Sequence, residues 1–172
     1  MALRNLLSPE RIAIVVELDN RAAVLEAAAR LLAEPGPGPS GHTVSRPALA
    51  RIIGDGLHKR ELLASTAIGH GVAVPHARIE GLDESRVVFL RLAQPVDFHA
   101  ADGKPVDLVL ALAMPAHYVQ QHLEFLAEMA EMFADPGFRA ELRAMPTIER
   151  LRGRLLQGDS QAATPLQPES SA

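Results

Sequence analysis

Two histidines at the ends of a short apolar stretch are the first residues in this chain that could do chemistry. The segment GHGVAVPHARIEG, residues 69 to 81, carries His70 and His76 around three apolar residues. Histidine suits nucleophilic or acid–base work near neutral pH, where its ring titrates. Pro75 fixes its own φ and biases Val74 toward an extended backbone, so we expect a strand end that presents His76 in a defined direction. Taken on spacing alone, a surface or hydrogen-bonded structural histidine is the commoner interpretation.

His70 is a candidate neighbour of His76. In an extended chain residues 70, 72, 74 and 76 share one face, which predicts that His70 borders the same pocket. Gly69 and Gly71 weaken this expectation because either can bend the chain away. A metal shared by the two histidines would need a third ligand, and no recognisable spacing supplies one, so we expect no metal and no cofactor.

His122 lies early in a predicted helix over residues 116–135. At 100° per residue it sits about 60° from the centre of the apolar stripe, which predicts a half-sheltered ring. A histidine at the edge of the core is the plain interpretation. The start of a helix, however, favours a phosphoryl dianion and disfavours a charged imidazole.

Periodicity indicates the elements that must position these side chains. We expect strands over 11–18, at VAVPH, and over 86–98 and 105–115. Helices are expected over 19–34, capped by Asp19 or Asn20, over 45–65, capped by Ser45, and over 116–135, 136–145 and 146–157. Residues 35–41 and 99–104 are predicted connections, and residues 158–172 a disordered tail. This order predicts one α/β layered domain over residues 1–157.

Composition excludes several classes of protein. The chain has 172 residues, a hydrophobic fraction of 48%, a formal net charge of -4 and a sequence pI near 6.0, which argues against a nucleic-acid binder. It has no cysteine, hence no disulfide and no thiolate site. Neither a signal peptide nor a membrane-spanning segment is apparent, so we expect a soluble cytoplasmic protein.

Three segments together carry a resemblance to a known family. RELLASTAIGHGVAVPHARIEGL, PVDLVLALAMP and HLEFLAEMAEMFAD resemble the active-site region of IIA domains of the bacterial phosphotransferase system, of the mannitol/fructose type. The similarity covers roughly residues 5 to 157. It implies a mixed β-sheet of about four to five strands flanked by α-helices.

The resemblance also implies roles for particular residues. His76 matches the histidine that accepts a phosphoryl group from the phosphocarrier HPr or its nitrogen-branch counterpart. His122 matches the second active-site histidine, which orients the first, and Arg60 matches the arginine at the rim. Ser65 and Thr66 match hydroxyl residues that could bind phosphate, although at least one of them fits a helix-to-strand turn better. His70 departs from the Glu or Asn usual in the family.

Two branches of the family and one different class remain open. The wording of TAIGHGVAVPHARIEGL favours a regulatory phosphoprotein of the nitrogen branch, which switches partner proteins by its phosphorylation state. The alternative is a metabolic IIA that passes phosphate to a separate sugar-specific IIB. The absence of cysteine and of a long apolar span predicts a free-standing IIA in either case. A binding module that has lost phosphotransfer is disfavoured because both His76 and His122 are present.

Overall fold

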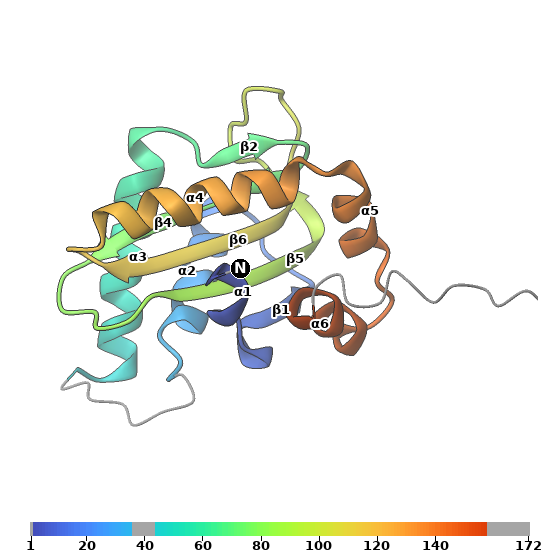
Figure 1. Ribbon diagram of the computed structural model, residues 1–172. Helices are drawn as coiled ribbons and strands as arrows, with labels where there is room; N and C mark the ends of the chain where they lie inside the picture. The colour runs from blue at the N-terminus through green and yellow to red at the C-terminus, as the bar shows by residue number, and fades with distance from the viewer. Residues whose placement is uncertain (1, 36–43, 158–172) are drawn as a thin grey trace, which may run out of the picture.

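A computed structural model describes residues 2–35 and 44–157 of the chain. The predicted tail and most of the predicted loop at 35–41 lie outside the described residues. In chain order the elements are α1 (Ala2–Asn5), the 3₁₀ turn η1 (Pro9–Arg11), β1 (Ile12–Val15), α2 (Arg21–Leu32), α3 (Arg46–Leu63), β2 (Ala67–Gly69), β3 (Val72–Ala73), β4 (His76–Ile79), β5 (Arg86–Val96), β6 (Val106–Pro115), α4 (Val119–Ala134), α5 (Pro136–Ala144) and α6 (Ile148–Gln157). Figure 1 shows a central sheet with helices on both faces.

The sheet is mixed and has six strands within residues 2–35 and 44–157. Its order is β1-β5-β6-β3-β2. β4 also pairs with β6, further along that strand than β3 does. The β5–β6 pair is antiparallel, whereas β1 runs parallel to β5, and β3 and β4 both run parallel to β6. β6 therefore pairs with both strands of segment 69–81 that lie between His70 and Ile79, namely β3 and β4.

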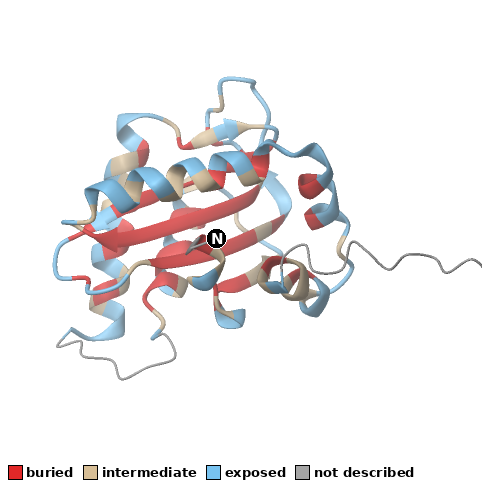
Figure 2. Cartoon of the chain, in the orientation of Figure 1, coloured by how far each residue is buried: buried red, intermediate tan, exposed pale blue. Residues whose placement is uncertain are grey.

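The long central strands alternate their apolar side chains between two cores, as the period of two requires. On β6, Val109, Ala111 and Ala113 face α2 and α3 in one core. Leu108, Leu110 and Leu112 face α1, α4, α5 and α6 in the other. Figure 2 shows β5 and β6 buried along most of their length, with α4 laid across one face.

The predicted α/β fold is confirmed, and the differences lie in short elements. Asn20 caps α2 through its side chain and Ser45 caps α3, as predicted. The first strand, at residues 12–15, is shorter than the predicted 11–18: residue 11 belongs to a 3₁₀ turn, and residues 16–18 lie outside the strand. Within the described residues the sheet exceeds the expected four to five strands for two reasons. β2, of three residues, is too short to show a period, and the strand expected at VAVPH is split into β3 and β4.

Candidate active site

His76 is the first residue of β4 and is almost completely buried, with a relative exposure of 7%. Its ring is held at both nitrogens. Nδ1 lies 2.7 Å from the Val74 carbonyl oxygen, and because a carbonyl only accepts, the proton resides on Nδ1. Nε2 accepts a hydrogen bond from Nε of Arg60 at 3.1 Å. The ring is therefore a neutral imidazole whose basic lone pair, on Nε2, accepts the Arg60 hydrogen bond.

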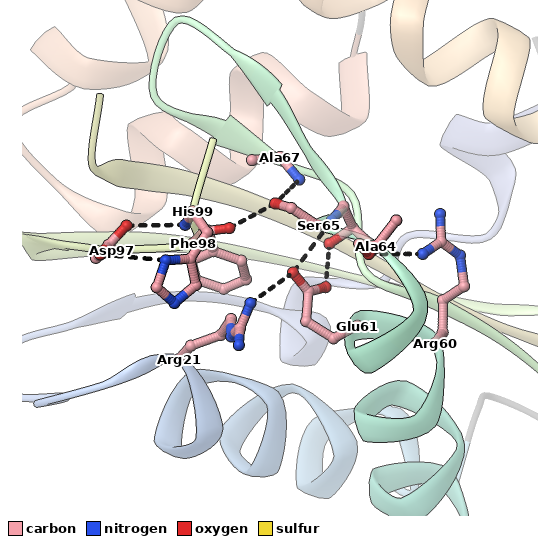
Figure 3. Close-up of polar contacts among 10 residues, drawn as sticks. Arg21, Arg60, Glu61, Ala64, Ser65, Ala67, Asp97, Phe98 and His99 are labelled. Carbon is pink, nitrogen blue, oxygen red and sulfur yellow. Dashed lines mark hydrogen bonds and ion pairs between the residues drawn. The ribbon is translucent and has the colours of Figure 1, made fainter. Parts of the chain in front are cut away.

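Arg60 reaches this nitrogen from the last turn of α3. Its Nη1 donates to the Ala64 carbonyl oxygen at 2.8 Å, which ties the guanidinium to the end of its own helix. The C-terminal turn of a helix favours such a cation because its carbonyls carry partial negative charge. Figure 3 shows this contact to Ala64 on the side of α3 away from Glu61.

His122 lies beside His76, as expected from its place on α4. The two ring centroids are 5.1 Å apart and the ring planes meet at 76°, an edge-to-face arrangement. His122 is half-buried, and its Nδ1 is buried without a hydrogen-bond partner among the described residues. Its backbone N–H donates to the carbonyl of Tyr118, the N-cap, so the ring stands in the first turns of α4.

Burial lowers the pKa of both imidazoles. For His76 desolvation is the largest cause, the hydrogen bond to Val74 opposes it, and the positive charge of Arg60 adds to it. For His122 desolvation again comes first, followed by the charges of His76, Arg78 and Arg60. Both rings are therefore neutral near pH 7, which is the state a nitrogen nucleophile needs.

The two histidines open into a pocket of about 760 Å³ between α3, β4 and the start of α4. Three cations contribute to its lining, namely Lys59, Arg60 and Arg78, against one carboxylate, Glu80. The local balance is thus positive in a chain whose formal net charge is -4. Exposed Leu63, Val119 and Leu123 form the apolar part of the wall.

A buried carboxylate supports the backbone that carries His76. Glu61 of α3 accepts hydrogen bonds from the backbone N–H of Thr66 at 3.1 Å and from its hydroxyl at 2.6 Å. Arg21 of α2 lies 3.6 Å from the same carboxylate (Figure 3). The Thr66 carbonyl in turn accepts from the N–H of Val74, whose own carbonyl holds the His76 ring. Sequence reasoning did not single out Glu61, because its contacts with Thr66 and Arg21 depend on how α2 packs against α3.

The hydroxyls of Ser65 and Thr66 are engaged in the turn between α3 and β2. Ser65 donates to the Phe98 carbonyl and accepts from the N–H of Ala67 (Figure 3). Thr66 donates its single hydroxyl proton to Glu61. Both residues line a smaller pocket of about 230 Å³ that also reaches His76. Because each hydroxyl has one proton and that proton is committed, the geometry favours the turn role for both, where the sequence suggested it for at least one.

His70 does not join this site, and the expected alternation from residue 70 to 76 is wrong. β2 and β3 pair antiparallel, so the chain reverses at His70 and Gly71 instead of staying extended. Both residues have positive φ, +56° and +76°. His70 is exposed and lines a separate depression with Lys104, Asp107 and Arg143. Gly69 and Gly71, both with positive φ, allow the bend that places His70 away from His76.

The pocket defines a class of protein: a single α/β domain that presents a neutral, buried histidine beside a second histidine and an arginine. Comparison with known proteins agrees. Residues 5–157 match the family model "Phosphoenolpyruvate-dependent sugar phosphotransferase system, EIIA 2". The chain belongs to this family, whose members carry phosphoryl groups on histidine.

Among the curated relatives that cover most of the chain are two nitrogen regulatory proteins. The chain is 36% identical over 149 residues to the nitrogen regulatory protein of Pseudomonas aeruginosa, covering 87% of this chain and 91% of that protein. It is 33% identical to that of Bradyrhizobium diazoefficiens, covering 84% and 88%. The crystal structure of nitrogen regulatory protein IIA-Ntr from Neisseria meningitidis superimposes with a TM-score of 0.74 at 30% identity, covering 90% and 99%.

No helix in the part of the chain that the structure describes is both long enough and apolar enough to span a membrane. Within residues 2–35 and 44–157 there is likewise no group of three or more histidine or acidic side chains placed to hold a metal ion.

Proposed function

We propose that this chain is a phosphocarrier of the nitrogen-regulatory type, which accepts a phosphoryl group on His76 from a histidine phosphocarrier of the HPr type. The observation that carries the proposal is the pair of hydrogen bonds on the His76 ring. They leave Nε2 unprotonated and turned toward a guanidinium. A nitrogen in that state can attack phosphorus, and the guanidinium can bind the phosphoryl oxygens in two-pronged fashion.

The transfer step needs no proton movement from the attacking atom. The Nε2 lone pair forms the new P–N bond while the P–N bond of the donor phosphohistidine breaks, and that pair of electrons returns to the donor ring. The His76 ring keeps its Nδ1 proton, so it gains positive character, which the Val74 carbonyl stabilises. A ring that keeps this proton is also a good leaving group, which suits a protein that must pass the phosphoryl group on.

His122 and Arg60 supply charge stabilisation in this proposal. The unpartnered Nδ1 of His122 is available to a phosphoryl oxygen once one is present beside the His76 ring. Arg60 gives up its bond to Nε2 and turns to the phosphoryl oxygens, because Nε2 cannot accept a hydrogen bond and form a bond to phosphorus with the same lone pair. Phosphoryl transfer depends mainly on such positioning and electrostatics.

The regulatory branch is favoured over the sugar-transport branch by the relatives that match over most of both chains. In that branch the phosphorylation state of His76 would control the binding of partner proteins. The alternative, a metabolic IIA that hands phosphate to a sugar-specific IIB, uses the same chemistry at His76. The two differ in the acceptor and not in the site.

The test is phosphorylation with phosphoenolpyruvate, enzyme I and either of two carriers, HPr or its nitrogen-branch counterpart. We expect faster uptake from the nitrogen-branch carrier, one acid-labile phosphate per chain, and its location at His76 by mass mapping. His76→Ala should take up none. His58→Gln, at a helix residue outside the pocket, is the matched control and should be labelled normally. Labelling of His76→Ala at the normal level would refute the assignment, and rapid onward transfer to a sugar-specific IIB would favour the metabolic branch.

A further inference from the structure

Arg78 stands two residues after His76 on β4, so the two side chains leave the strand on the same face. The neighbours on the opposite face, Ala77 and Ile79, are buried in the core against α3. The register with β6 pairs Arg78 with Met114 in a continuous parallel ladder. These contacts fix the direction of Arg78 and place its Cα about 7 Å from that of His76.

The Arg78 side chain forms no polar contact within the described residues. It is exposed, it lines the pocket together with His76 and His122, and its guanidinium has no hydrogen bond or ion pair with any of the residues that the structure describes. Its positive charge lies near enough to His122 to lower the pKa of that ring. A free guanidinium is therefore held at the mouth of the nucleophile's pocket.

A phosphoryl group on His76 requires more donors than Arg60 offers. It presents three oxygens and about two negative charges. Arg60 already donates one N–H to Ala64, and its fork can serve at most two oxygens at once. The lining cations Lys59, Arg60 and Arg78, less the carboxylate of Glu80, give a formal charge of about +2, which matches the dianion only if Arg78 is included.

We propose that Arg78 is a second phosphoryl-binding arginine, which contacts the phosphoryl group on His76 from the side of His122. This inference rests on the proposed function, because it requires phosphate on His76. In this inference Arg78 stabilises the phosphorylated form of His76. Arg60 and Val74, which contact the unphosphorylated ring, set its tautomer and its nucleophilicity.

The test measures the equilibrium of phosphoryl transfer between the carrier and the chain. Arg78→Gln should lower the equilibrium constant toward the phosphorylated chain about tenfold, the usual size of one charge-assisted hydrogen bond. Arg78→Lys keeps the charge without the planar fork and should lose about threefold. The loss in Arg78→Gln should shrink as salt rises from low to about 0.5 M, because the contact is exposed to solvent.

A second readout separates contact from structure. The second ionisation of the phosphoryl group, followed by ³¹P NMR, should move to higher pH in Arg78→Gln because a cation that favours the dianion has been removed. The other charged groups that face the phosphate, Lys59, Arg60, Glu80 and His122, are unchanged in this comparison. The control is Arg150→Gln on α6, an exposed arginine on a helix that packs beside β1 at the far edge of the sheet.

The outcomes distinguish this inference from the proposed function. If His76 in the unmodified chain takes up no phosphate, both fail. If His76 is labelled but Arg78→Gln matches Arg150→Gln in the equilibrium constant and in the ³¹P titration, the inference alone is overturned. Thermal unfolding checks that both variants are folded; should Arg78→Gln be unstable, Arg78→Lys decides through the same two readouts.

Discussion

The guanidinium of Arg60 meets the imidazole of His76 at Nε2, across 3.1 Å, so this arginine covers the lone pair that accepts the phosphoryl group in the proposed function. Arg60→Ala should slow phosphoryl uptake by about 100-fold, the usual cost of removing one donor aimed at developing charge. It should also raise the pKa of His76, because a nearby positive charge is lost while the burial remains. Single-turnover labelling and NMR titration measure the two effects. Arg60→Lys should recover part of the rate, and uptake by Arg60→Ala within twofold of normal would contradict the role.

His122 should matter more for transfer than for folding. Its ring lies edge-on to His76 with the centroids 5.1 Å apart, and Nδ1 has no partner in the described structure. His122→Ala should still accept phosphate on His76, but exchange with the carrier should be about 10- to 100-fold slower. Rapid-quench kinetics in both directions would measure this. Unchanged exchange rates would leave His122 as a packing residue of α4.

Acid should destabilise the folded chain through these two histidines. Burial lowers the pKa of His76 and of His122 below the ordinary value of 6.5, so the unfolded chain binds more protons than the folded one just below that pH. The free energy of unfolding should therefore be at its full value above about pH 7 and should fall as the pH drops below 6.5 toward the folded pKa values.

Urea unfolding between pH 7.5 and 5 tests this dependence. The double variant His76→Gln/His122→Gln should show a flatter profile over this range. His99→Gln, at an exposed residue that does not line the pocket, should keep the normal slope. Equal slopes in the double variant and the unmodified chain would show that other groups carry the dependence.

Glu61 should prove essential to the turn that supports the site. Its carboxylate is buried and receives both the N–H and the hydroxyl of Thr66. Glu61→Ala leaves those donors buried without an acceptor and should cost about 3 kcal/mol of unfolding free energy. Glu61→Gln keeps an oxygen for the N–H and loses mainly the ion pair with Arg21, so it should cost about 1 kcal/mol. Chemical unfolding distinguishes the two, and equal costs would argue against the Thr66 contacts.

His70 should be replaceable without effect on phosphorylation. It occupies the tip of the β2–β3 hairpin with φ of +56°, and its backbone is held by Asp102 and Arg143. His70→Asn suits this left-handed conformation and should change stability by no more than about 0.5 kcal/mol. The hydrolysis rate of the phosphorylated chain between pH 6 and 8 should match the unmodified profile. A flattened profile would place the imidazole nearer the phosphoryl group than the hairpin allows.

The sequence determined the long elements and their order. β5 and β6 are long enough for their apolar runs to be recognised in the sequence. Asn20, Ser45 and Pro136 mark helix starts, which can be predicted because capping depends on local geometry. His76 could be singled out for a similar reason, since Pro75 fixes its own φ and biases Val74 toward an extended backbone just before His76. The resemblance then predicted the family that the comparison with the family model confirms.

Only the tertiary structure decided how the site is assembled. Arg60, His76 and His122 come together from three separate elements, α3, β4 and α4. The reversal at Gly71, the pairing of β4 with β6, and the packing of α3 against β4 bring about this arrangement. The tertiary structure also places His70 at the tip of the β2–β3 hairpin, away from His76. It places Ser65 and Thr66 in the turn after α3, where Glu61 accepts hydrogen bonds from Thr66. Periodicity reports which face of an element is apolar, but it does not report which elements become neighbours, because that depends on the combined burial of all of them.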